Sequence, residues 1–107
     1  MSSGKLDSDR GRRIVELKVF TLPGCSVCPL AKAIASEVAQ DLGIAYREVD
    51  LATQDGLNEG LSYDIMSTPS IVINDDVIVR GQLVSKEKLR EEVKTRLEKW
   101  KARASSE

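Results

Sequence analysis

Histidine is absent from this chain of 107 residues, and cysteine occurs only twice, at Cys25 and Cys28. A mononuclear structural zinc site takes four ligands, normally Cys or His, so one chain cannot build such a site from these residues. The lack of histidine also excludes a Cys–His protease dyad, a histidine general base and a His-ligated haem. We therefore expect no metal site. Two cysteines three positions apart are also unlike the disulfide framework of a small secreted domain.

Long apolar runs and an excess of one charge are missing as well. No apolar run approaches the roughly 20 residues that span a bilayer, and residues 1–10 lack the apolar core of a signal peptide. The chain has 16 basic and 17 acidic residues, for a formal net charge of -1, whereas nucleic-acid-binding domains usually carry a basic excess. We therefore expect a cytoplasmic protein that binds neither membranes nor nucleic acid.

The remaining composition is that of one globular domain. Hydrophobic residues make up 41% of the chain and charged residues 31%, which is ordinary for a soluble domain. A chain of this length buries a core without metals or disulfides. We expect a flexible N-terminal tail over residues 1–13, a domain over residues 14–101 and a frayed C-terminus over residues 102–107.

Hydrophobic patterning predicts the order β-α-β-α-β-β-α. The predicted strands cover residues 14–21, 44–50, 70–73 and 77–79, and the predicted helices cover residues 26–42 and 53–63 and begin again after residue 85. The first strand, helix and strand form a βαβ unit, which favours parallel pairing through a right-handed crossover. Residues 74–76 form a hairpin turn that adds an antiparallel pair. The fold class is therefore α/β, with a mixed sheet of about four strands flanked by helices.

Each predicted helix has apolar residues at four-residue intervals, which predict its buried face. In chain order these residues are Leu30, Ile34, Val38 and Leu42, with Ala31 and Ala35 beside them on the same face, then Leu57 and Leu61, then Leu89, Val93, Leu97 and Trp100. Gly43 is placed to cap the end of the first helix, while Thr53 and Ser85 are placed to cap the beginnings of the other two.

The motif Cys25-Ser26-Val27-Cys28-Pro29 lies where the first strand passes into the first helix. When these residues open a helix, the two cysteine side chains lie one turn apart, within the roughly 4.4–6.8 Å between Cα atoms that a disulfide requires. The helix N-terminus stabilises an anion and lowers the pKa of a thiol beside it. We therefore predict dithiol–disulfide exchange with Cys25 as the attacking thiol and Cys28 as the resolving thiol.

Two features of the motif region have simpler interpretations. Cysteine also behaves as a small buried hydrophobe, so the pair alone is compatible with a structural role. Pro69, which follows Thr68 just before the third predicted strand, is allowed at a strand entrance and would by default follow a trans bond.

Over residues 14–98 the chain resembles the thioredoxin/glutaredoxin superfamily, and most of all the small glutaredoxin-like thioredoxins of archaea and bacteria. The resemblance rests on the Cys25-x-x-Cys28 motif, on Thr68-Pro69, on the predicted hairpin of residues 71–79 and on Gly81 after it. It implies the thioredoxin fold and a protein-disulfide reductase that needs no cofactor beyond its redox-active disulfide.

The same resemblance implies roles for residues around the cysteines. Pro69 is expected to follow a cis bond and to face the disulfide, and Thr68 is expected to pair through its backbone with an extended substrate segment. We also expect Gly24, Ser26 and Val27 to contact the substrate.

The chain departs from its relatives at several places. Thioredoxins typically carry Trp-Cys-Gly-Pro-Cys, whereas Gly24 stands here in place of the Trp. Val19 stands where they carry a buried Asp that accepts a proton from the resolving thiol. Glutathione-dependent glutaredoxins carry a Gly-Gly pair and then an acidic residue after the hairpin. Here Gln82 follows Gly81 and Ser85 lies near the acidic position.

We therefore expect a monomer that reduces protein disulfides and takes electrons from a flavoprotein disulfide reductase or a dithiol. Two alternatives stay open. In the first, two chains each offer Cys25 and Cys28 to a bridging iron–sulfur cluster. In the second, the protein is a redox-inert binding module that keeps the fold.

Overall fold

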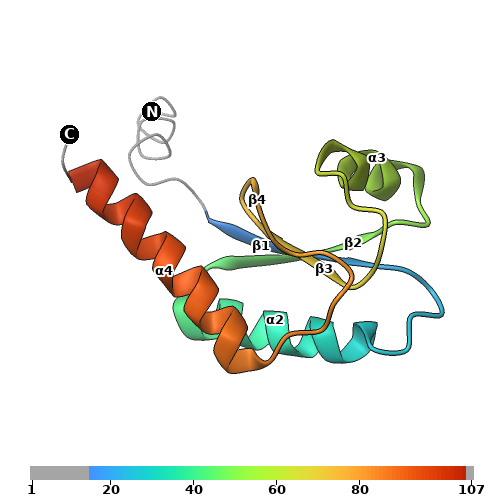
Figure 1. Ribbon diagram of the computed structural model, residues 1–107, viewed down its shortest axis with the longest axis horizontal. Helices are drawn as coiled ribbons and strands as arrows, with labels where there is room; N and C mark the ends of the chain where they lie inside the picture. The colour runs from blue at the N-terminus through green and yellow to red at the C-terminus, as the bar shows by residue number, and fades with distance from the viewer. Residues whose placement is uncertain (1–14, 106–107) are drawn as a thin grey trace, which may run out of the picture.

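A four-stranded mixed sheet forms the centre of the protein (Figure 1). The computed structural model describes residues 15–105, with side chains over residues 15–101. The elements are β1 (Glu16–Thr21), α2 (Cys28–Leu42), β2 (Ala45–Asp50), α3 (Gln54–Ser62), β3 (Ser70–Ile73), β4 (Asp76–Val79) and α4 (Lys86–Ser105). The predicted order of elements and the α/β fold class are confirmed.

The strands lie in the order β2-β1-β3-β4. β1 is parallel to β2, with Leu17 opposite Tyr46, and antiparallel to β3, with Val19 opposite Ile71. β4 pairs antiparallel with β3, and a bulge interrupts their register between Ile71 and Val72. The hairpin turn is one residue shorter than predicted, because β4 begins at Asp76. This topology brings the end of β1, the start of β3 and the end of β4 to the same edge of the sheet.

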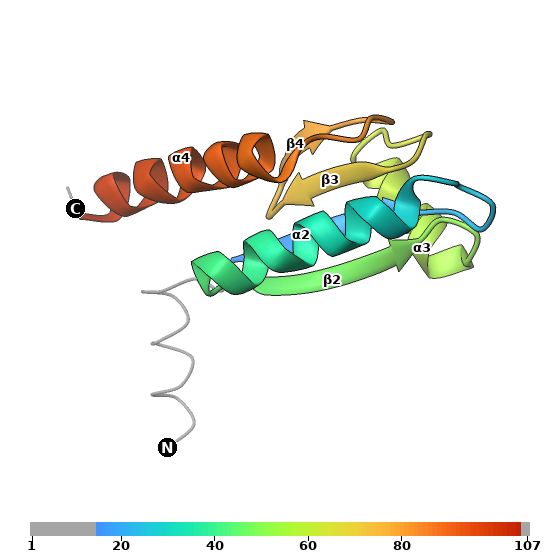
Figure 2. The ribbon, with the colours of Figure 1, turned by 90° about the horizontal axis from the view of Figure 1, so that it is seen from below.

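Helices cover both faces of the sheet. Figures 1 and 2 show α2 and α4 on one face and α3 on the other. β1 is buried on both sides, because Leu17 and Val19 enter the core beneath α2 and α4 while Phe20 enters a second core on the α3 side. Leu89 and Val93 of α4 are fully buried in the first core, as predicted.

The buried face of α2 agrees with the predicted one except at Leu30. It is formed by Ala31, Ala35, Val38 and Ala39, whereas Leu30 is 52% exposed. Four residues overshoot one turn of 3.6 residues, so a line of side chains at four-residue intervals drifts around the helix. Leu30, at the start of that line, therefore lies outside the buried face, and the small alanines let α2 pack close to the sheet.

The buried face of α3 differs from the prediction. Leu57 and Leu61 are exposed, and Gly56 and Gly60 face the sheet instead. A Cβ at Gly56 would overlap the backbone carbonyl of Asp50. The glycines that lower the helix propensity of this segment are thus required by its close approach to the end of β2.

The predicted caps are present. Gly43 ends α2 in the left-handed conformation, with φ 68°. The Thr53 hydroxyl accepts the Gly56 N–H at 3.0 Å, and the Ser85 hydroxyl accepts the Lys88 N–H at 3.1 Å. Helix α4 continues to residue 105, past the expected end of the domain at residue 101. The tail expected over residues 1–13 lies outside the described residues.

Ion pairs attach α4 to the rest of the fold. Lys86 lies 3.2 Å from both Glu37 and Asp41 of α2, and Arg96 lies 3.3 Å from Asp76 of β4. Among the helices of residues 15–105, none is long and apolar enough to cross a membrane.

A buried lysine interrupts the apolar core on the α3 side. Lys18 is 6% exposed, and its Nζ donates to Glu59 Oε2 at 3.0 Å and to the Tyr63 hydroxyl at 2.8 Å. Burial lowers the pKa of Lys18, but the hydrogen bonds to Tyr63 and Glu59 outweigh it and raise the pKa overall. Arg47, which donates two hydrogen bonds to Glu59, lowers the pKa of that carboxyl together with Lys18. The ammonium is therefore buried with its partners in place.

We predict that Gly56→Ala destabilises the protein by about 1–3 kcal/mol, because the added methyl group overlaps the Asp50 carbonyl. Urea unfolding followed by far-UV circular dichroism measures the change. Leu57→Ala, at an exposed position of the same helix, serves as the control and should shift stability by less than about 0.5 kcal/mol. A gain of about 1 kcal/mol in Gly56→Ala, the helix-propensity difference between the two residues, would contradict this packing.

Candidate active site

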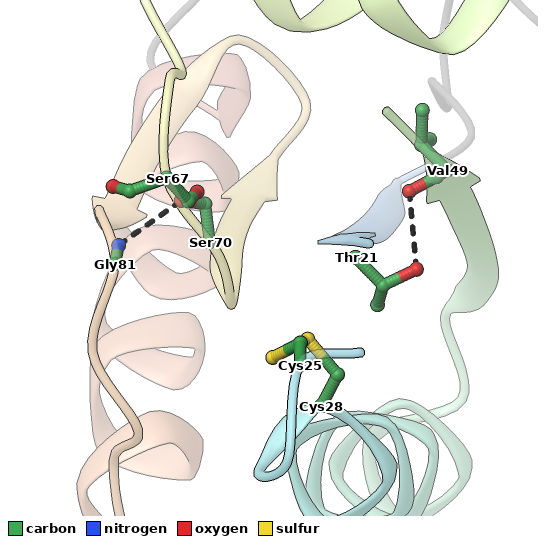
Figure 3. The surroundings of a disulfide bond; sticks show 7 residues. All are labelled: Thr21, Cys25, Cys28, Val49, Ser67, Ser70 and Gly81. Atoms are coloured by element: carbon green, nitrogen blue, oxygen red, sulfur yellow. Dashed lines mark hydrogen bonds between the residues drawn. A yellow bond between two sulfur atoms is a disulfide. The ribbon is translucent and has the colours of Figure 1, made fainter. Parts of the chain in front are cut away.

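The cysteine pair lies in the loop that carries the chain from β1 to α2. β1 ends at Thr21, and a turn closed by the hydrogen bond from Cys25 N–H to Leu22 O (3.2 Å) follows it. Gly24 adopts the positive φ of 87° that this turn requires. Cys25 and Cys28 form a disulfide, with 5.4 Å between their Cα atoms (Figure 3).

The helix begins at Cys28, two residues later than predicted. Val27 is its N-cap and contributes no side-chain hydrogen bond. The first backbone bond runs from Ala31 N–H to Val27 O at 3.0 Å. Cys25 therefore precedes the helix, although both cysteines still meet at its N-terminus. Because α2 has no acidic residue in its first turn, the positive end of its dipole is available to a thiolate.

The two cysteines differ in exposure. Cys28 is 3% exposed, whereas Cys25 is only partly buried. Val19 is fully buried in the core beneath α2 and α4, so the position of the family's buried carboxylate is apolar here. Lys32, one turn after Cys28, lies 3.7 Å from Glu48. Within residues 15–105, no group of three or more His, Cys, Asp or Glu residues is placed to hold a metal ion.

The segment that enters β3 faces the disulfide across the site. In Figure 3, Ser67 and Ser70 lie on one side of the cysteine pair, and Thr21 lies toward the other, near Val49. The Thr68–Pro69 bond is cis, as the family resemblance implies. Pro69 is fully buried, and Thr68 is partly buried. Among the described residues, none makes a hydrogen bond to the backbone N–H or C=O of Thr68.

Exposed apolar side chains occur in the segments that meet at this edge of the sheet. We call them the apolar rim: Leu22 (38% exposed), Val27 (39%), Leu30 (52%), Met66 (75%) and Leu83 (39%). Of the rim residues, only Val27 is predicted from the sequence as a site residue. Four-residue spacing assigned Leu30 to the core, and the other three stand in loops, where periodicity carries no signal. Gly24 and Ser26, which were also predicted to contact substrate, are exposed beside Cys25.

The sequence matches known proteins over most of this fold. A family model described as the thioredoxin domain matches residues 15–94. A thioredoxin of Methanocaldococcus jannaschii is 37% identical over 83 residues, which cover 78% of this chain and 96% of that protein. The chain belongs to the thioredoxin family. A probable thioredoxin of Archaeoglobus fulgidus is also 37% identical, over 68 residues that cover 64% of this chain and 75% of that protein.

The solved structure of thioredoxin 1 from Thermosipho africanus shares the thioredoxin fold, with a TM-score of 0.64. It is 17% identical and covers 78% of this chain and 94% of that one. Family membership and the Cys25–Cys28 disulfide together make this thioredoxin a dithiol–disulfide oxidoreductase. The exchange takes place at a cysteine pair at the start of a helix, where a thiolate is stabilised.

We predict that the reduced protein is alkylated by iodoacetamide about tenfold or more faster at Cys25 than at Cys28, because Cys28 is almost fully buried and Cys25 is accessible beside the helix N-terminus. Brief labelling followed by peptide mass spectrometry measures the two rates. Labelling after unfolding in urea, where the two thiols should react alike, is the control. Equal rates in the folded protein, or faster labelling of Cys28, would contradict the prediction.

Proposed function

We propose that this thioredoxin reduces protein disulfides, with Cys25 as the nucleophile and Cys28 as the resolving thiol. The observation that carries the assignment is the difference in exposure between the two residues at one helix N-terminus. An incoming disulfide reaches Cys25 first, whereas Cys28 reacts within the protein. Thiolates rather than thiols attack disulfides, and a thiolate at Cys25 lies beside the open N-terminus of α2, where an anion is stabilised.

The exchange proceeds in two balanced steps. The Cys25 thiolate attacks one sulfur of the substrate disulfide, that S–S bond breaks, and the other substrate sulfur leaves as a thiolate. Cys28 then loses its proton and attacks the Cys25 sulfur. The Cys25–Cys28 disulfide forms, and the second substrate sulfur leaves. Two electrons pass to the substrate. One substrate sulfur takes the Cys28 proton, and the other leaves as a thiolate that takes a proton from water.

The proton of Cys28 needs an acceptor outside the core. Val19 occupies the position of the usual buried carboxylate and is fully buried among apolar residues. We assign the proton to the substrate thiolate released in the first step, because that group leaves as a base at the site. Catalysis then needs no buried acid on the protein.

The substrate is an extended protein segment. The backbone of Thr68 offers an N–H and a C=O without partners among the described residues, so a segment can pair there by strand addition. The apolar rim lies in the segments that meet at the same edge of the sheet, and burying it against the partner would add hydrophobic stabilisation. Because the rim side chains are apolar, they favour substrates with apolar residues next to the cysteine.

We further propose that the protein acts as a monomer in the cytoplasm and takes its electrons from a flavoprotein disulfide reductase or a dithiol. The cysteine pair itself is the redox group, so no other cofactor is required. Its two cysteines form one exchangeable pair rather than a structural framework, which suits a reducing compartment.

We predict that Cys28→Ser accumulates a mixed disulfide on Cys25 when it is mixed with an oxidised protein substrate such as insulin, because the resolving thiol is gone. Non-reducing electrophoresis and peptide mass spectrometry identify the linked cysteine. Cys25→Ser is the matched control and should form no such adduct. Trapping on Cys28 in the Cys25→Ser protein would show that the two roles are reversed.

The reduction potential tests the direction of electron flow. We predict a value of about -200 to -270 mV, the range of glutaredoxins and thioredoxin. Equilibration in graded dithiol buffers, followed by counting of alkylated thiols by mass, gives the value. A potential near -120 to -180 mV would mean an oxidant or isomerase and would overturn the proposed direction and compartment. The absence of any intramolecular disulfide would contradict the exchange mechanism and would favour the iron–sulfur alternative.

A further inference from the structure

Ser70 places a buried hydroxyl between two loops of the site. It is the first residue of β3 and is fully buried. Its Oγ donates to the backbone carbonyl of Ser67 at 2.7 Å and accepts the backbone N–H of Gly81 at 3.1 Å. One side chain thus joins the segment before β3 to the loop after β4. Figure 3 draws the hydrogen bond between Gly81 and Ser70 as a dashed line.

The two loops are in close contact around this hydroxyl. The Gln82 N–H donates to the Pro69 carbonyl at 3.1 Å. Gly81 has a φ of 72°, and a Cβ at its position would overlap the Ser67 side chain. The residues on both sides of Thr68, Ser67 and Pro69, are therefore fixed by hydrogen bonds to the Ser70 hydroxyl and to the loop after β4. Gly81 has no side chain, which permits this close approach of the two loops. None of these contacts uses the backbone of Thr68 itself.

We propose that Ser70 is a positioning residue, which fixes the backbone edge of Thr68 against the disulfide so that a protein substrate docks in register with Cys25. The inference rests on the proposed function, because it needs Thr68 to be the docking edge. Ser70 touches neither cysteine in this role and acts only through the Ser67–Pro69 segment. A protein substrate depends on this edge, whereas a small disulfide needs only access to Cys25.

The test compares the wild-type chain with Ser70→Ala on two substrates, with dithiothreitol as the reductant. Insulin is the protein disulfide, and dithionitrobenzoate is the small one. We expect kcat/KM for insulin to fall about tenfold in Ser70→Ala, mainly through KM, because a displaced docking edge misaligns the substrate. The rate with dithionitrobenzoate should stay within about twofold, because Cys25 and its helix N-terminus are unchanged. Ser70→Thr keeps the hydroxyl and should restore most of the insulin activity.

Val93→Ala is the matched control for stability, since it truncates a buried residue of α4 outside the site and should leave both rates unchanged. Equal losses on both substrates, or an unchanged rate with insulin, would overturn the role of Ser70. A wild-type protein that does not reduce insulin would instead refute the proposed function, and the inference with it.

Amide hydrogen exchange tests the same geometry if Ser70→Ala does not fold. In the folded wild-type protein the Gly81 N–H should exchange slowly, because it donates to a buried hydroxyl. Exchange at the rate of an open loop amide would show that the two loops are not joined there and would overturn the inference.

Discussion

The burial of β1 on both faces is the constraint on which the rest of the structure depends. Leu17 and Val19 fill the core beneath α2 and α4, while Lys18 and Phe20 point to the α3 side. A shift of one residue in register would exchange these two sets and place an ammonium group in the apolar core under α2. Because the chain passes from β1 directly into the turn that carries Cys25, the register of this strand also fixes where the disulfide lies.

The buried ammonium of Lys18 needs a partner on the α3 side of the sheet, and Glu59 of α3 provides it. The burial of β1 therefore also fixes the position of α3. The pKa of Lys18 is raised, so the stability that its partners provide is complete below its unfolded pKa and is lost only as the pH rises through the higher folded value. The pKa of Glu59 is lowered, so its contribution is complete above its unfolded pKa and is lost as the pH falls through the lower folded value. Both groups therefore stay charged across the neutral range, and the ion pair that attaches α3 to β1 is intact throughout it.

Much of the fold and the chemistry could be predicted from local sequence signals. Caps such as Thr53 and Gly43, the alternation in the strands and the Cys25–Cys28 spacing each depend on a few neighbouring residues. The buried face of α3 and the exposure of Leu30 on α2 could not be predicted in the same way, because they depend on how close each helix lies to the sheet. Periodicity assigns the largest apolar side chains to the core, whereas close packing here selects alanine and glycine and leaves leucines such as Leu30 exposed.

The exposed leucines and the buried serine at the site both depart from the rule that apolar residues are buried and polar residues are exposed. Leu30 has the spacing of a core residue, and only the placement of the helix on the sheet shows that it is exposed. Ser70 is the converse case, since a polar residue at a fully buried strand position is costly unless both of its hydrogen-bonding functions are used. The Ser67 carbonyl and the Gly81 N–H use both. The requirement to satisfy one buried hydroxyl thereby fixes two loops of the site relative to each other.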